Sequence, residues 1–419
     1  MSELVGVLRK NFGRFCPKIF FVATIFMLGL FGTAKAAKPL PEIVWAHDVY
    51  TMNVAGDDQT AQRRRGYQLL NAGTVEEQQQ NREKIAAAID AKLKEQGAKL
   101  PFKLKTSFEG NDVSELNAEL SDATVGDAPI ALVPIVVIDY AIEQVYQING
   151  KPHYKYIIIS ALDIAFCSED DDGALTILGN IPVHYYESIP LSNNFAQMTQ
   201  RDKAELARIY TNFTVDMIKK NLDFTKYKKV LKTLTDKKLA GETYRVENIS
   251  YTSEKAKGIL GMNRLMQRIC GNIFTSDFAA HTGNVVYPMI LQGDTSNWTI
   301  DATQGFYVAK MSTSHSGEKT VRMPASVDHK IYLNVSGIGS AEVQTKQVSN
   351  INGFKAYRLW MESTIDGKKI EVTNDITEEY LKDTSSANKI IKDEREIFGG
   401  LMIGAAVKSA AAQAGKKVK

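Results

Sequence analysis

The densest set of potential ligand atoms is the segment "FCSEDDDGALTIL", residues 166–178, in which four acids and a glycine separate two apolar runs. Carboxylate oxygens are the ligands that calcium prefers, and a helix–loop–helix calcium loop needs acids at positions 1, 3 and 5, glycine at position 6 and glutamate at position 12. With Gly173 at position 6, position 1 is Ser168 and position 12 is Gly179, so two ligands are missing. The sequence therefore predicts a hairpin turn with exposed acids and no metal.

The histidines offer a second route to chemistry. His47-Asp48 is similar to the paired ligands of metal phosphohydrolases, but a site of that kind needs further histidine and acid ligands. A hydrolase would require His47, Asp48, His281 and His315 to meet in one cleft. The chain contains no nucleophile elbow, phosphate-binding loop or dinucleotide fingerprint. The sequence favours a non-enzymatic protein without a cofactor, and a His/Asp hydrolase is the alternative.

Residues 1–36 have the pattern of a cleaved signal peptide. A basic stretch precedes an apolar run from Ile19 to Phe31, and Ala34-Lys35-Ala36 supplies a small-x-small cleavage motif. As a helix the run would span roughly 20 Å, which is less than the ~30 Å hydrocarbon layer. No cysteine that could accept a lipid follows the run. We therefore predict export to the periplasm or exterior of a bacterial cell.

Loss of the signal peptide changes the charge balance. The whole chain has a net charge of +3, and removing the five basic residues and one acid of the signal leaves about −1. Without a positive field, binding to a nucleic-acid backbone lacks its main attraction, so nucleic acid is not an expected partner. Cys167 and Cys270 remain in the mature chain, and they can form a disulfide or stay as separate buried thiols.

The order of apolar patterns predicts an α+β fold of two packed α/β units with mostly antiparallel sheets. The first unit covers residues 37–238, the second covers 239–390, and a helix rich in small residues covers 391–419. The clearest element is a helix that Thr74 can cap and Gly97 can end. Buried strands follow at three places, and a second long helix begins at Gln200. The three strands are expected at Ile130–Ile138, Tyr154–Phe166 and Leu175–Tyr186.

The tail contains small residues spaced four apart, which allow another helix or sheet to approach closely. They are Gly400, Gly404, Ala405 and Ser409. Three interpretations follow: a terminal helix docked on its own domain, self-association, or peripheral contact with a membrane.

The order helix, buried strand, two long strands joined by a polar tip, and second helix resembles a known periplasmic module. It is similar to the periplasmic domain of the curli-secretion-channel lipoproteins and the related lipoproteins that activate cell-wall synthases. The resemblance covers residues 74–234, and the lipid-accepting cysteine of those families is absent. It implies an α/β module that oligomerises or binds a partner without catalysis. We therefore expect a protein that acts by contact with itself or another envelope protein; a solute- or lipid-binding module is a further alternative.

Overall fold

The structure is a computed structural model in which the chain divides into two units, Met1–Leu40 and Pro41–Lys419. All residues that the structure describes lie in the second unit. They are residues 42–45, 47–52, 69–100, 102–105, 130–148, 151–170, 172–191, 197–227, 234, 242–254, 264–290, 298–312, 318–341, 352–381 and 410–418. The predicted signal peptide therefore lies outside the described residues.

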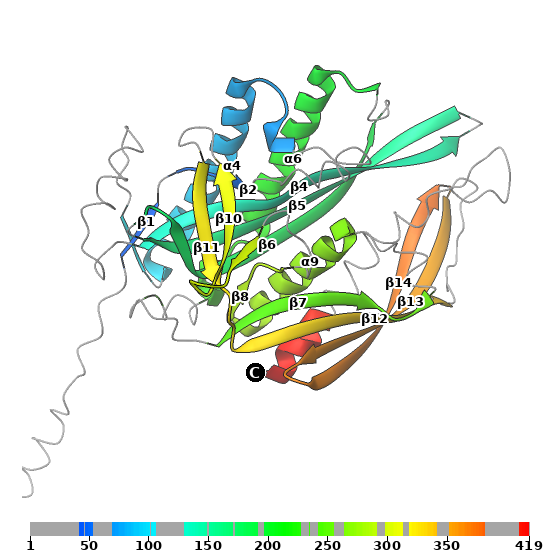
Figure 1. Ribbon diagram of the computed structural model, residues 1–419. Helices are drawn as coiled ribbons and strands as arrows, with labels where there is room; N and C mark the ends of the chain where they lie inside the picture. The colour runs from blue at the N-terminus through cyan, green and yellow to red at the C-terminus, as the bar shows by residue number, and fades with distance from the viewer. Residues whose placement is uncertain are drawn as a thin grey trace, which may run out of the picture. The chain divides into compact units, whose positions relative to one another are not determined.

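The described residues form helices and two mixed sheets, which confirms the predicted α+β class (Figure 1). The α-helices are α4 (Val75–Gln96), α6 (Gln200–Asn221), α9 (Arg264–Thr282) and the C-terminal helix, residues 410–418. Short 3-10 turns are η2 (Leu69–Asn71), η3 (Gly97–Lys99) and η5 (Phe224–Tyr227). None of the helices in this part of the chain is both long enough and apolar enough to cross a membrane.

Sheet A contains nine strands, and six of them close on themselves. The closed circuit runs β2-β10-β11-β6-β5-β4 and returns to β2, while β1, β3 and β9 flank it. Its strands are β1 (Glu42–Trp45), β2 (Tyr50–Met52), β3 (Lys103–Lys105), β4 (Ile130–Ile148), β5 (Lys151–Glu169), β6 (Leu175–Leu191), β9 (Thr299–Asp301), β10 (Phe306–Ser312) and β11 (Glu318–Pro324). The long β4–β5 and β5–β6 hairpins confirm the three buried strands expected from the sequence.

Sheet B contains five strands in the order β14-β13-β12-β7-β8. They are β7 (Thr243–Tyr251), β8 (Val285–Tyr287), β12 (His329–Ala341), β13 (Asn352–Ile365) and β14 (Lys368–Leu381). Strands β7 and β8 are parallel, and α9 makes the crossover between them. The Phe278 ring of α9 lies 5.2 Å from the Tyr244 ring of β7, and α9 also contacts β6, so this helix lies between the two sheets.

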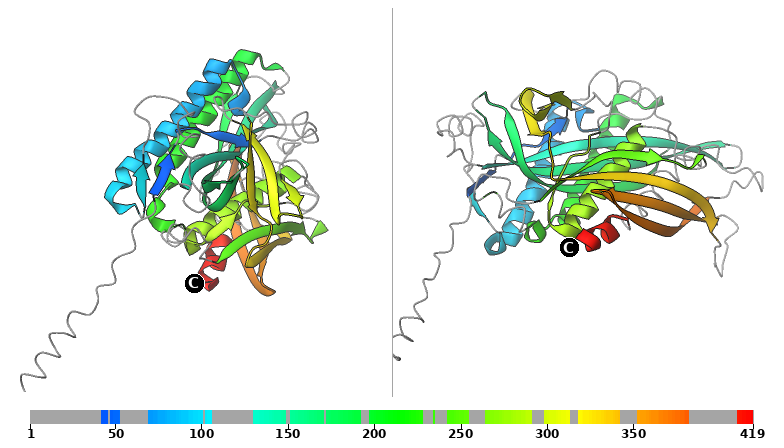
Figure 2. Two further views of the ribbon diagram at one scale, coloured as in Figure 1. Left: turned by 60° about the vertical axis from the view of Figure 1, so that its left-hand side comes forward. Right: turned by 60° about the horizontal axis from the view of Figure 1, so that its bottom comes forward.

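Helices α4 and α6 lie side by side on sheet A (Figure 2). Each begins with a capping box, in which Thr74 exchanges hydrogen bonds with Glu77 and Thr199 does so with Asp202. At the other end of the pair, Gln96 of α4 donates to the Leu222 carbonyl, 3.2 Å away. The two helices are therefore parallel, with their N-termini at the same end.

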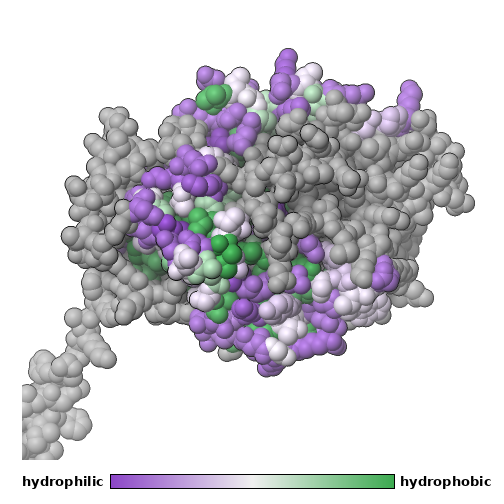
Figure 3. All heavy atoms as spheres, in the orientation of Figure 1, coloured by the Kyte–Doolittle hydropathy of each residue, from purple (hydrophilic) through white to green (hydrophobic). Residues whose placement is uncertain are grey.

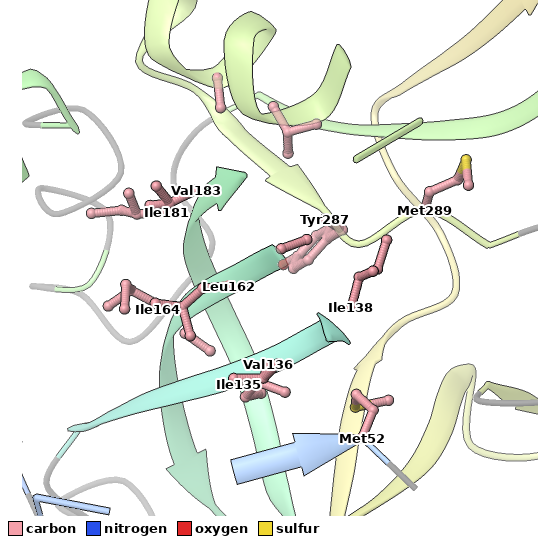
Figure 4. Close-up of a cluster of buried hydrophobic side chains, with 14 of the residues drawn as sticks. Met52, Ile135, Val136, Ile138, Leu162, Ile164, Ile181, Val183, Tyr287 and Met289 are labelled. Atoms are coloured by element: carbon pink, nitrogen blue, oxygen red, sulfur yellow. The ribbon is translucent and has the colours of Figure 1, made fainter. Parts of the chain in front are cut away.

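The core is continuous across these layers. Figure 4 shows part of it, where buried side chains from β2, β4, β5, β6 and the β8 segment come together. The labelled members are Met52, Ile135, Val136, Ile138, Leu162, Ile164, Ile181, Val183, Tyr287 and Met289. Residues from both halves of the chain contribute, so the core is not divided by sequence position.

The predicted division of the chain at residue 238 does not separate the two sheets. Strands β9 to β11, which fall in the predicted second unit, belong to sheet A and pair with β2 and β6. Arg245 of β7 joins the sheets, because its guanidinium donates to the carbonyls of Pro324 and Ala325 at the end of β11. It also lies 5.0 Å from the centre of the Tyr307 ring.

The C-terminal helix packs on the end of α9. Ala410, Ala411 and Ala414 are fully buried, and a Cβ on Gly415 would lie 2.8 Å from the His281 Cβ. Small residues permit this close approach, as expected for a terminal helix docked on its own domain. Of the tail, only residues 410–418 are described; the predicted contact residues Gly400, Gly404, Ala405 and Ser409 lie outside the described residues.

Candidate functional site: the outer face of sheet B

The acidic segment forms a hairpin turn between β5 and β6, as predicted. The Gly173 N–H donates to the Asp170 carbonyl at 2.8 Å, and Gly173 has a φ of 76°, which favours glycine. The neighbouring Asp170 N–H donates to the Ala174 carbonyl, also at 2.8 Å. The residues at this turn that the structure describes therefore serve the backbone geometry of a hairpin.

Two basic side chains of β11 form ion pairs with Glu169, Asp170 and Asp172, a role that the sequence prediction missed. Arg322 bridges Asp170, with an Nη1–Oδ2 distance of 3.1 Å, and also contacts both carboxylate oxygens of Asp172. The Lys319 Nζ lies 3.2 Å from Glu169 Oε1. Hydrogen bonds from Arg322 hold the pKa of Asp172 below its ordinary value. This ionic clamp reinforces the short parallel contact between β6 and β11 that helps to close sheet A.

The candidate histidines have separate partners. The His47 Nδ1 lies 3.0 Å from Asp90 Oδ2 of α4, and Asp48 accepts a hydrogen bond from the Val49 N–H. His281 instead contacts the Asp277 carbonyl at 2.7 Å on α9. His315 lies outside the described residues. Within the described ranges, no group of three or more His, Cys, Asp or Glu residues is placed to hold a metal ion.

Cys167 and Cys270 are both free and buried. Burial raises the pKa of each thiol, so neither is activated as a nucleophile. Of the two alternatives that the sequence left open, a disulfide or separate buried thiols, the structure has the separate thiols.

Two buried acids have strongly shifted pKa values. Burial raises the pKa of Asp139 to about 7, although its carboxylate accepts the Leu70 N–H at 3.2 Å. Burial likewise raises the pKa of Asp163 to about 7, and Asn180 donates to Asp163 Oδ1 at 3.4 Å. Both carboxyl groups are enclosed by the core, so we assign them to the interior packing and not to a substrate site.

Large exposed apolar side chains are scarce in the described part of the chain, and two of them share one face. Tyr332 of β12 is 46% exposed and Trp360 of β13 is 39% exposed, while Val75 and Ile300 lie elsewhere. Figure 3 shows the described surface in one view as mainly hydrophilic, with hydrophobic residues in small groups. Two aromatic side chains on one face of a sheet therefore stand out.

The alternation of side chains defines this face. Along β12 and β13 every second residue is buried, namely Ile331, Leu333, Val335, Met361, Ser363 and Ile365. The residues between them point to the other side, which we call the outer face of sheet B. Cross-strand pairing places Tyr332 opposite Thr364, and Gly337 opposite Trp360.

Trp360 lies over a glycine. A Cβ on Gly337 would be 2.9 Å from the indole Cε3, closer than carbon atoms tolerate. The pairing of β12 with β13 shifts between Val335 and Gly337, and this bulge brings the glycine opposite the indole. The glycine thus allows the ring to approach the backbone of the neighbouring strand.

A polar network occupies the row between the two aromatic residues. Asn334 Nδ2 donates to Glu362 Oε2 and to Thr252 Oγ1, each at 3.1 Å. The Lys369 ammonium lies 2.8 Å from Glu362 and 2.8 Å from Glu371. Hydrogen bonding from Lys369 lowers the pKa of Glu362, so the carboxylate stays charged as part of the network. The outer face consequently offers fixed donors and acceptors between two aromatic rings.

Comparison of the sequence with protein-family models gives no match, and comparison with curated proteins gives none either.

Proposed function

We propose that this chain is an exported, non-catalytic protein of the bacterial envelope that acts by binding another envelope component through the outer face of sheet B. The observation that carries the proposal is the exposed Trp360 side chain, held against Gly337 on a sheet whose opposite side is buried. Aromatic side chains that are rigidly supported and exposed are the residues that most often dominate binding surfaces. The N-terminal pattern of residues 1–36 supports export.

The buried groups support binding over catalysis. Asp139 and Asp163 are enclosed by the core, the two thiols are buried, and His47 and His281 each contact a partner of their own. Two clefts are lined by described residues, one between α4 and α6 and one at the end of α4, and neither lining includes a serine, cysteine or histidine. We therefore rank the His/Asp hydrolase below a binding protein.

The test measures association of the purified mature protein with isolated bacterial envelopes. We expect Trp360→Ala to reduce the bound fraction about tenfold, because losing a central aromatic anchor typically costs this much. Ile300→Ala is the matched control, since Ile300 is a 61% exposed apolar residue on sheet A. Equal binding of the wild type and Trp360→Ala would refute the proposal.

A cleft at the end of α4 supports a second candidate function, the binding of an anionic amphiphile. Its volume is about 580 Å³, and its lining combines four large apolar side chains with two lysines and one glutamate. It is lined by Glu42, Leu93, Lys94, Gly97, Leu100, Phe102, Lys103 and Leu104. A titration with oleate should show saturable binding that Lys103→Glu weakens; no binding of oleate would remove this candidate.

A further inference from the structure

We infer that the outer face of sheet B binds an extended, uncharged polysaccharide, with Trp360 and Tyr332 as stacking platforms. This inference rests on the proposed function and names the chemical class of its partner. Sugar rings present C–H groups on their flat faces and hydroxyl groups around their rims. An aromatic ring has a negative face that attracts such C–H groups, whereas amide and carboxylate groups bond the hydroxyls.

The spacing of the aromatic side chains fits a polymer. Tyr332 and the Gly337–Trp360 pair are separated along β12 by five residues, one of which belongs to the bulge. At the usual rise of a strand, this separation is about 13 Å, which is larger than one sugar ring. A single chain lying along the direction of β12 would thus contact both aromatic rings.

The residues between the aromatic rings argue for sugar over protein. A stable protein interface has a contiguous apolar core that is surrounded by a polar rim. Here the middle row contains Asn334 and Glu362, which are joined by a hydrogen bond, so the apolar surface is interrupted. A polysaccharide needs this alternation, because its own surface alternates between C–H faces and hydroxyl groups.

The charges favour an uncharged ligand. Lys369 is shared by Glu362 and Glu371, and the exposed Lys330 lies on the same face two residues from Tyr332, so in the described part of the face two cations balance two carboxylates. With no net charge among these four groups, the face has no strong attraction for a polyanion or a polycation. Among polysaccharides, the face therefore selects neutral chains such as those built from glucose or N-acetylglucosamine.

Tryptophan fluorescence gives a specific assay. The protein has three tryptophans, and Trp45 and Trp298 are 0% and 8% exposed, so acrylamide should quench mainly Trp360. We expect the tetrasaccharides of N-acetylglucosamine or glucose to protect Trp360 from quenching in the wild type. The protein should also sediment with insoluble chitin or cellulose. Failure of every one of these glycans to protect Trp360 and to sediment the protein would overturn the inference.

Variants separate stacking from folding. We expect Trp360→Ala to weaken sedimentation at least tenfold, and Tyr332→Ala to weaken it less. Gly337→Ala keeps the indole but forces it off the strand, so it should also weaken binding, while Ile300→Ala should not. Wild-type binding by both Trp360→Ala and Gly337→Ala would contradict the assigned surface.

One further arm distinguishes this inference from the proposed function. Envelopes are treated with either a glycan hydrolase or a proteinase before the protein is added. Loss of Trp360-dependent binding after the hydrolase supports the polysaccharide. Loss after the proteinase alone would leave the proposed function standing with a protein partner and would refute the polysaccharide.

Discussion

Replacing the buried Asp163 with asparagine should remove a pH-dependent cost of folding. The side chain lies on β5, opposite Ile135 and Pro182, and is almost completely buried. Asp163 Oδ2 and Asn180 Oδ1 both lack a hydrogen-bond partner. A neutral carboxyl group or an amide at position 163 can offer a donor in this pair, whereas a carboxylate can offer only acceptors.

The size of the effect follows from the pKa. Burial raises the pKa of Asp163 from 3.8 to about 7 in the folded protein. The folded state then binds the proton more tightly than the unfolded chain, so the free energy of unfolding falls as pH rises between about 4 and 7 and levels off above 7. A shift of about three pKa units corresponds to up to about 4 kcal/mol. Asp163→Asn should abolish this loss.

The assay is urea unfolding of the wild type and Asp163→Asn at pH 4.5 and pH 8. We expect the variant to be more stable than the wild type at pH 8, by about 1–4 kcal/mol, with the difference shrinking toward zero at pH 4.5. Asp139→Asn serves as a comparison, because Asp139 also titrates at about 7 and contributes its own slope. If the free energies of unfolding of the wild type and Asp163→Asn differ by the same amount at pH 4.5 and pH 8, this reasoning is refuted.

Three further predictions concern packing and charge. Gly415→Val should lower the free energy of unfolding by about 1–3 kcal/mol, because its Cβ would lie 2.8 Å from the His281 Cβ. Gln413→Ala, at an exposed position of the same helix, should change the free energy of unfolding little, and equal urea midpoints for these two variants would contradict the docked helix. Arg322→Gln should reduce the free energy of unfolding at pH 7, and this reduction should disappear as pH falls below about 4. The reason is that the ion pair with Asp172, which lowers the pKa of that carboxyl group, stabilises the folded protein only while the carboxylate is charged. A loss of stability that persists at low pH would rule out the ionic explanation. Cys167 and Cys270 should react with a thiol reagent only after unfolding, and a reductant should leave the unfolding midpoint unchanged; a shift on reduction would reveal a disulfide.

Local pattern was enough to predict several elements. Thr74 and Gly97 bracket α4 as expected, because capping depends on residues within one turn of the helix end. Gly173 likewise sets the hairpin turn, since a positive φ is a property of that residue and its neighbours.

Long-range pairing decided the rest. Strands β10 and β11 join sheet A although they follow β7 in the chain, and the cations that neutralise the acidic turn come 150 residues later than their partners. Sequence spacing carries no signal for such contacts, because they form only when distant strands meet.

The outer face of sheet B shows the same division. By itself the sequence determined the α+β class, the capped start of α4 and the hairpin turn at Gly173, and it contains none of the common catalytic motifs. Only the tertiary structure decided which face is exposed, because Ile331, Leu333 and Met361 are buried in the core on one side of the sheet while Trp360 and Tyr332 remain in contact with solvent. A shift of one residue in the register would exchange the two faces, so the position of Trp360 depends on the partners of the strand and not on its own sequence.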